Sequence, residues 1–297
     1  MKVAITGATG FLGTALRSRL EGGGHDVVAV SRRPGPDTIV WDPAAGSLDA
    51  TALDGVDAVV NLAGAGIADR PHTSARKAVL RNSRLGATSL IAETIAGLDR
   101  PPEVLLSASA MGFYGSRGDE VLPESASAGD DFLARLCTDW EAATAPAEAA
   151  GIRTAHLRTS IVLDRRGGAL GKQLPLFRLG LGARAGKGGQ WMPWITVDDH
   201  LSAMEHLLTT DVSDPFNLST PEPVTNAVFT KAVASHVGRP TFLVIPHATT
   251  HLPLGVGDLV ESLLFTSARM QPTVLESSGF TFAHPTLDDA LGAVIGR

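Results

Sequence analysis

The sequence predicts an α/β protein built on a doubly wound parallel sheet with a smaller C-terminal α+β domain. An apolar strand at residues 1–6 runs directly into a glycine-spaced turn at residues 7–13, which opens a helix. The apolar runs at 58–63 and 104–107 are typical of strands that are buried on both faces of a parallel sheet. With 297 residues, of which 44% are hydrophobic, the chain is long enough to bury a full core.

The turn at residues 7–13 has the spacing G-x-x-G-x-x-G, which differs from the G-x-G-x-x-G of ordinary dinucleotide folds. Gly7 permits the tight turn, Gly10 lets backbone N–H groups approach a pyrophosphate, and Gly13 lets the helix pack closely on the strand. The helix N-terminus adds partial positive charge. The alternative is a structural turn without a ligand, but the preceding strand and the following helix favour a nucleotide site.

The second strand, at residues 26–30, ends at Ser31, Arg32 and Arg33. A fold of this type that binds NAD places an acidic residue here for the ribose 2′-hydroxyl, whereas an arginine accommodates a 2′-phosphate. The acid is absent, so the sequence predicts NADP(H), with Arg32 on the 2′-phosphate, Ser31 as a hydroxyl partner and Arg33 beside the adenine. Two solvated turn arginines are the alternative.

Further cleft residues are expected where the next strands end, because such folds bind ligands at the carboxyl ends of their strands. Ala63 and Gly64 leave room for a ring after the strand at 58–63. A helix expected over 74–96 carries Arg84, which is equally compatible with a cofactor contact and a solvated position. The strand at 104–107 passes into small hydroxyl residues at 107–110, which are candidates for substrate contact.

The second half of the chain contains an expected helix at 130–150, ended or kinked by Pro146, and strands at 153–158 and 161–163. We place the nucleotide-binding domain at 1–165, with return segments near 190–220. The substrate domain then occupies 166–297, including a tail at about 246–297. Later elements are a helix that Asp198 or Asp199 caps, a strand at 216–218, a helix that Thr225 caps, a strand at 242–245 and a final helix near Thr286.

The glycine-rich segment 179–190 carries Arg184 and is followed by Trp191 and Trp194. It is not a P-loop, because the first glycine and the terminal Ser or Thr of that motif are missing. It is either a solvated surface loop or a clamp for an anionic substrate. The two tryptophans suggest a pocket wall or a cleft rim beside it.

Composition excludes several classes of protein. The net charge of −6 argues against nonspecific nucleic-acid binding, which needs a concentrated positive surface. Cys137 is the only cysteine, so an internal disulfide and a cysteine-rich metal site are both excluded, and no metal is expected. We expect a cytoplasmic protein without a membrane partner, because neither a signal-peptide layout nor an apolar run of about 20 residues is present. No pattern indicates an oligomeric state.

The sequence resembles the extended short-chain dehydrogenase/reductase superfamily through residues 6–13, 61–64 and 197–199. More narrowly, it is similar to an NADP-type epimerase family group with a C-terminal domain of unknown function. The segments that carry this narrower likeness are 32–34, 61–64, 107–110, 129–133, 140–143, 190–195 and 225–227. The resemblance implies a Rossmann domain, an NADPH site and a smaller substrate domain. The expected cofactor contacts are Gly7, Thr9, Gly10, Phe11, Leu12, Gly13, Ser31, Arg32, Leu62, Ala63, Gly64, Arg84, Ser107 and Val162; Arg184, Trp191 and Trp194 are expected in the substrate pocket.

The chain departs from the superfamily in its catalytic pair. These enzymes use Tyr-x-x-x-Lys, in which the lysine lowers the pKa of the tyrosine that transfers the proton. Alignment on Glu141 puts Leu133 and Cys137 at the two positions, and the only tyrosine, Tyr114, has no lysine four residues later. Ser109 resembles the catalytic Ser/Thr, with Ser107 as an alternative, and Tyr114 is the best remaining acid.

Two functions are therefore expected. The first is an NADPH-dependent oxidoreductase or epimerase-like enzyme that acts on an unidentified small polar substrate, for which an anion is one candidate. The second is a non-catalytic NADPH-binding sensor or partner-binding module, which the missing pair favours.

Overall fold

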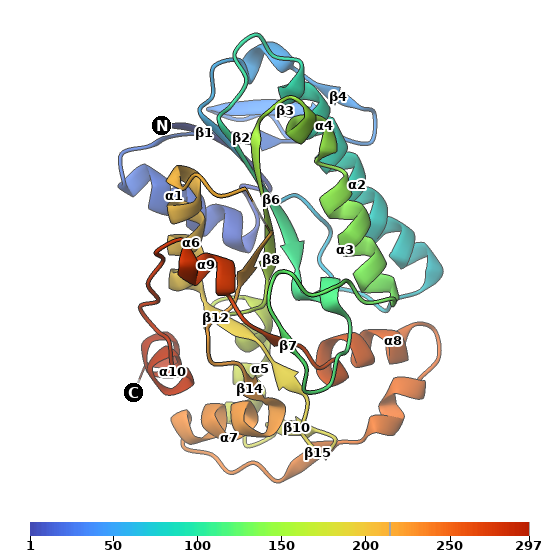
Figure 1. Cartoon of the computed structure of the whole chain (residues 1–297). Coiled ribbons are helices and arrows are strands. Elements are labelled where there is room, and N and C mark those ends of the chain that lie inside the picture. Colours follow the sequence, from blue (N-terminus) through green and yellow to red (C-terminus); the bar gives the residue numbers. More distant parts are fainter. Residues whose placement is uncertain (214, 297) are drawn as a thin grey trace.

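The structure is a computed structural model that describes residues 1–213 and 215–296. An eight-stranded sheet with the order β13-β8-β6-β5-β1-β2-β3-β4 occupies one half of the molecule (Figure 1). Its strands are β1 Lys2–Thr6, β2 Asp26–Ser31, β3 Thr38–Asp42, β4 Ser47–Leu48, β5 Ala58–Asn61, β6 Val104–Ala110, β8 Arg153–Thr159 and β13 Pro215–Leu218. All neighbours are parallel except β3 and β4. The predicted doubly wound parallel sheet is confirmed, and its strand order reverses between β1 and β5.

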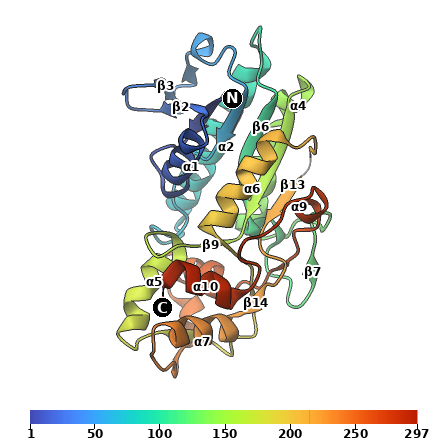
Figure 2. The same ribbon diagram turned by 90° about the vertical axis from the view of Figure 1, so that its left-hand side faces the viewer.

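Helices cover both faces of this sheet (Figures 1 and 2). On one face, α1 (Phe11–Gly22) and α6 (Val197–Thr209) bury leucines such as Leu16 and Leu207 against the strands. On the other face, α2 (Ser74–Ala96) buries Ile91 and its neighbours. The apolar spacing of these segments explains the two layers, because residues three or four apart share one side of a helix.

The helix expected over 130–150 is two helices, α3 (Phe132–Ala142) and α4 (Ala145–Ala149). Pro146 lies in the first turn of α4, where its missing N–H leaves no bond unmade. A single continuous helix would have required that N–H, so the chain restarts at this point.

The other half of the molecule holds small sheets and short helices (Figure 2). Strand β9 (Ile161–Leu163) pairs with β12 (Trp194–Thr196), β10 (Ala183–Ala185) with β15 (Leu243–Ile245), β11 (Trp191–Met192) with β14 (Val224–Thr225), and β7 (Val121–Leu122) with β16 (Arg269–Met270). The helices of this half are α5 Gly168–Arg178, α7 Asn226–His236, α8 Val256–Val260 and α10 Leu287–Ile295, with a short 3-10 turn at His247–His251 and a π turn at Glu261–Phe265. Helix α9 (Thr273–Ser277) instead packs against β13 of the large sheet, and further 3-10 turns span Ala50–Ala52 and Met111–Tyr114. The segment 179–190 is therefore not wholly a loop, because it contains β10. The boundary at residue 165 stays a prediction.

The helix caps agree only partly with expectation. Thr225 and Thr286 are N-caps, as predicted. The cap of α6 is Thr196, not Asp198 or Asp199: the Thr196 hydroxyl accepts a hydrogen bond from Asp199 N (3.0 Å) and donates to Asp199 Oδ2 (2.9 Å). Because β12 runs straight into the helix, the capping position falls two residues before Asp198 and three before Asp199.

His200 on α6 is expected to make the fold acid-sensitive. The side chain is fully buried, with Nε2 3.1 Å from Thr159 Oγ1, and burial lowers its pKa from 6.5 to about 4. Because the pKa is lower in the folded state, its contribution to stability is present above pH 6.5 and is lost as the pH falls toward 4. The free energy of unfolding in urea should therefore drop by about 2 kcal/mol between pH 7 and pH 5 on account of His200.

The variant His200→Gln isolates this contribution. The difference in pH dependence between the wild-type protein and the variant should equal the drop assigned to His200, because the carboxylates are common to both proteins. Identical pH profiles would contradict a buried neutral histidine.

Within the described residues, no helix is both long enough and apolar enough to cross a membrane.

Candidate cofactor cleft and active site

The glycine turn is held together by contacts that leave no room for side chains. Gly7 has a φ of +67°, and its carbonyl accepts a hydrogen bond from Gly10 N (2.9 Å). A Cβ on Gly13 would lie 2.2 Å from Gly7 O, and one on Gly7 would lie 2.8 Å from Leu62 O. The N-cap of α1 is Gly10, and no side chain of the described residues caps this helix. The N–H groups of the first helical turn are thus open to an anion, as a phosphate site requires.

Gly13→Ala is expected to lower the free energy of unfolding by about 1–3 kcal/mol or more, because the added methyl overlaps the backbone of the same turn. Gly22→Ala at the other end of α1 is the matched control. A Cβ there meets nothing within 4 Å, and alanine favours the helix by up to about 1 kcal/mol. Urea unfolding of both variants measures the difference; equal stabilities would refute the close packing.

A buried polar network fixes the segment that follows β5. Thr6 Oγ1 accepts hydrogen bonds from Leu62 N (3.0 Å) and Ala63 N (3.1 Å) and donates to Asn61 Oδ1 (2.7 Å). Asn61 Nδ2 in turn donates to Thr88 Oγ1 on α2 (2.8 Å). These bonds hold residues 62–64 at the carboxyl edge of the sheet, beside the glycine turn.

Arg84 lies against this segment. Its side chain passes within 3.4 Å of where a Cβ on Gly64 would be, stacks over Trp140 at 4.9 Å and donates to Leu80 O at 3.2 Å. Burial lowers the pKa of Arg84. Arg84 is therefore a half-buried cation beside residues 62–64, and its guanidinium packs against the protein and is not fully solvated.

Ser31 and Arg32 lie at the end of β2, next to Arg33. Both arginines are exposed, and neither side chain makes a hydrogen bond or ion pair with residues 1–213 or 215–296. Ser31 Oγ accepts a hydrogen bond from Arg33 N at 3.2 Å, which orients the turn. Two cations without partners are thus available at the strand end where a 2′-phosphate is expected.

The remaining expected cofactor residues surround the same edge. Thr9 and Phe11 are exposed, and Leu12 is half-buried. Phe11 packs on Gly167, where a Cβ would lie 2.6 Å from its ring, and Val162 packs against the core on the same side of the sheet as α1. Ser107 is fully buried, with its hydroxyl 3.5 Å from Asn61 Nδ2.

Ser109 belongs to a buried charged cluster at the ends of β6 and β8. The Ser109 hydroxyl donates to Glu141 Oε1 at 2.6 Å. Arg158 Nε and Nη2 each donate to one Glu141 oxygen at 2.9 Å. Burial by itself would lower the pKa of Arg158, but the hydrogen bonds and charge of Glu141 outweigh it and raise that pKa. Ser109 is thereby connected to a buried ion pair.

Tyr114 is fully buried on the far side of Arg158. Its hydroxyl donates to Asn217 Oδ1 at 2.7 Å and accepts from Arg158 Nη1 at 3.1 Å. Burial raises the pKa of Tyr114. These contacts are typical of a structural tyrosine, because no exposed surface remains through which it meets a substrate.

Leu133 and Cys137 occupy one side of α3, opposite Gly112. A Cβ on Gly112 would lie 3.2 Å from Leu133 Cβ and 3.7 Å from Cys137 Sγ. Burial raises the pKa of the Cys137 thiol to about 12. The thiol therefore stays protonated and is not a nucleophile.

The structure does not bring Arg184, Trp191 and Trp194 together around the cavity that Arg184 lines. Trp194 is fully buried in the core of the smaller half and donates to Glu222 O. Trp191 donates to Asp119 Oδ1 at 2.8 Å and stacks on Arg269. Arg184 instead lines a cavity with α7 and β15. The three residues lie on β10, β11 and β12, which belong to three different two-stranded sheets.

Sequence comparison places these features in a family. The model of the NAD dependent epimerase/dehydratase family matches residues 3–219, and a domain of unknown function, DUF1731, matches residues 251–294. The chain belongs to the NAD dependent epimerase/dehydratase family. An epimerase family protein of Mycobacterium bovis, Mb2239, is 42% identical over 99% of this chain and 98% of its own length.

Two solved structures of epimerase family members are similar over the whole chain. Human epimerase family protein SDR39U1 (isoform 2) with NADPH has a TM-score of 0.90 and 33% identity, covering 99% of both chains. The nucleoside-diphosphate sugar epimerase of Corynebacterium glutamicum has a TM-score of 0.81 and 37% identity, covering 100% of this chain and 58% of that one.

Proposed function

We propose that the chain binds NADPH in the cleft at the carboxyl ends of β1, β2 and β5. The observation that carries this proposal is the uncapped N-terminus of α1 above a turn in which Gly7 and Gly13 leave no space for a Cβ. Arg32 and Arg33, whose side chains have no partner in the described part of the chain, supply the charge for a 2′-phosphate. The similar human protein was solved with NADPH, which supports the same cofactor here.

We further propose that the protein is a cytoplasmic oxidoreductase or epimerase-like enzyme acting on a small polar substrate. NADPH, when bound, supplies hydride chemistry at the nicotinamide. The chain contributes Ser109, whose oxygen has lone pairs left to accept a hydrogen bond from a substrate hydroxyl while its own proton points to Glu141. When a substrate hydroxyl is oxidised, its proton moves to Ser109 Oγ as the serine proton moves to Glu141. When a carbonyl is reduced, the same two transfers run in reverse and deliver a proton to the carbonyl oxygen.

Arg158 positions this pair. It holds both Glu141 oxygens at 2.9 Å, so the carboxylate cannot rotate away from Ser109. Ser109 and Glu141 would thereby perform the proton transfer that Leu133 and Cys137 cannot perform at the positions of the usual tyrosine and lysine.

Ser109→Ala is expected to reduce turnover by about a hundredfold or more with unchanged NADPH affinity, because it removes the relay. Tyr114→Phe should instead lower the free energy of unfolding by about 1–3 kcal/mol, because Asn217 Oδ1 loses its partner, and should keep most of the turnover. Steady-state kinetics and urea unfolding separate the two. If Tyr114→Phe has normal stability and negligible turnover, Tyr114 and not Ser109 is the group that transfers the proton.

A non-catalytic NADPH-binding sensor is the second candidate. It is favoured by the full burial of Tyr114 and by the side chains at 133 and 137. The deciding experiment supplies bound NADPH with a panel of carbonyl compounds and nucleotide sugars and follows absorbance at the nicotinamide band. Oxidation by any member supports the enzyme. Tight binding without oxidation across the panel favours the sensor.

A further inference from the structure

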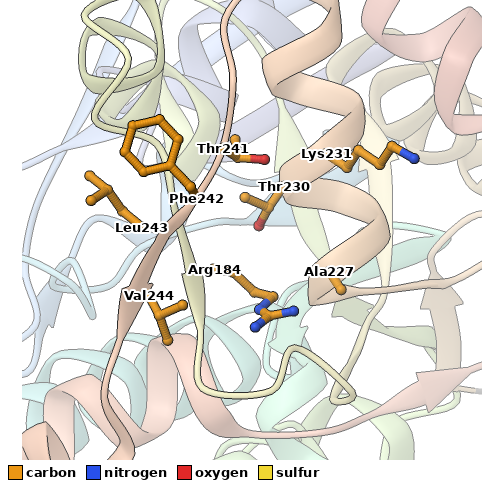
Figure 3. A pocket seen from close by; sticks show the side chains of 8 residues that line it. All are labelled: Arg184, Ala227, Thr230, Lys231, Thr241, Phe242, Leu243 and Val244. Carbon is orange, nitrogen blue, oxygen red and sulfur yellow. The ribbon is translucent and has the colours of Figure 1, made fainter.

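A cavity of about 310 Å³ lies in the smaller half of the molecule, between α7 and β15. Figure 3 shows Arg184 of β10 and Thr230 of α7 facing the space from two sides. The cavity is lined by Arg184, Ala227, Thr230, Lys231, Thr241, Phe242, Leu243 and Val244. In Figures 1 and 2, α7 lies at the opposite end of the molecule from β2 and β3, beside which Arg32 lies. The cavity is therefore separate from the cofactor cleft.

Arg184 is fixed in place at this cavity, although its charge is not paired. Its methylene chain fills the space beside Gly188, where a Cβ would lie 2.5 Å from Arg184 Cδ, and packs by Ala227. Two bonds of 2.9 Å hold the surrounding backbone: Ala185 N donates to Asn226 Oδ1, and Ala227 N donates to Gly188 O. Yet Arg184 Nε is buried without a hydrogen-bond partner among the described residues. A buried donor of this kind is costly unless something accepts its hydrogen bond.

The other polar groups of the cavity are hydroxyls that are also without partners in the described part of the chain. Thr230 is only 3% exposed, yet its hydroxyl makes no hydrogen bond there, and neither does that of Thr241. Lys231 lies at the rim, with its ammonium directed away from Arg184 (Figure 3). No carboxylate is among the lining residues. A ligand with several acceptor oxygens and negative charge would match this set.

We propose that this cavity binds the phosphate group of a small phosphorylated molecule. Arginine presents a planar fork of donors that matches phosphate oxygens, and hydroxyls complete the remaining acceptor positions. Phe242, a residue that is 73% exposed, and Val244 form an apolar wall beside the polar end. That wall accommodates an organic body, as in small-molecule sites that combine apolar surface with a few fixed polar groups.

The test is calorimetric titration of the full chain with phenyl phosphate, with NADP⁺ in excess so that the phosphate positions of the cofactor cleft are filled. Saturable binding with one ligand per chain is expected. Arg184→Gln should weaken it by about tenfold or more, because it removes a charge-assisted contact. Lys187→Gln is the matched control: Lys187 is exposed, makes no ion pair in the described residues and does not line the cavity, so binding should be unchanged.

Thr230→Val supplies a second variant that keeps the shape of the side chain and should also weaken binding. Inorganic phosphate should bind with the same dependence on Arg184 but more weakly than phenyl phosphate, since it lacks a body for the Phe242 wall. The proposal is overturned if wild-type protein shows no saturable heat, or if Arg184→Gln and Thr230→Val both bind phenyl phosphate normally. Equal binding of benzoate would overturn the assignment to phosphate.

Discussion

Arg32→Gln is expected to weaken NADPH binding by about tenfold to a hundredfold and to leave NADH binding nearly unchanged, because a charge-assisted hydrogen bond contributes about 1.5–3 kcal/mol. The two cofactors differ only in the 2′-phosphate. Arg32 is exposed at the end of β2 and has no partner in the described residues, so its removal disturbs no contact inside the protein. Fluorescence titration with both cofactors measures the change in selectivity.

Two further variants sharpen this prediction. Arg135→Gln on α3 makes the same change in charge at an exposed arginine without a partner in the described chain, and it should affect neither cofactor. Arg33→Gln should have a smaller effect than Arg32→Gln and should reduce the affinity for both cofactors, since Arg33 is expected beside the adenine. Added salt should weaken wild-type NADPH binding more than that of Arg32→Gln. Equal NADPH and NADH affinities in the wild-type protein would refute the assignment of Arg32.

The cofactor side of the molecule could be predicted because its signals are local. A short apolar strand, a glycine turn and a helix follow one another within 22 residues, and the contact that excludes a Cβ at Gly13 lies within the same turn. The helix over 74–96 was likewise predictable from its apolar spacing, and the structure adds Thr73 as its N-cap. Pro146 was recognised as a break, but only the structure shows that the helix restarts at Ala145.

The catalytic side could not be predicted in the same way, because its contacts join distant segments. Glu141 meets Ser109 across 32 residues and Arg158 across 17. The one available signal in the sequence was Arg158, near the end of the largely buried strand β8. A buried arginine requires an acidic partner. The position of Trp194 could not be predicted for a similar reason. A tryptophan beside a glycine-rich segment is compatible with a cleft rim and with a core, and only the pairing of β12 with β9 decides between them.

Glu141→Gln is expected to be among the most destabilising single changes in the chain. The side chains of Glu141 and Arg158 are only 12% and 5% exposed. Glutamine has nearly the same shape, but it leaves the Arg158 guanidinium without a counter-charge, and breaking a buried pair from one side costs about 3–5 kcal/mol. This loss is a large part of the free energy of unfolding of a typical domain, which is about 5–15 kcal/mol. Urea unfolding without cofactor measures the loss.

The double variant Glu141→Leu/Arg158→Met separates the cost of an unpaired charge from the worth of the pair. An apolar replacement of both partners removes the uncompensated cation and should recover much of the stability lost in Glu141→Gln. The same protein should remain inactive if Ser109 needs Glu141 as its acceptor, whereas recovery of both stability and turnover would make the pair purely structural. Arg158 also lies 3.4 Å over the Phe113 ring and donates to Glu124 O, so recovery should be incomplete even with a well-packed methionine.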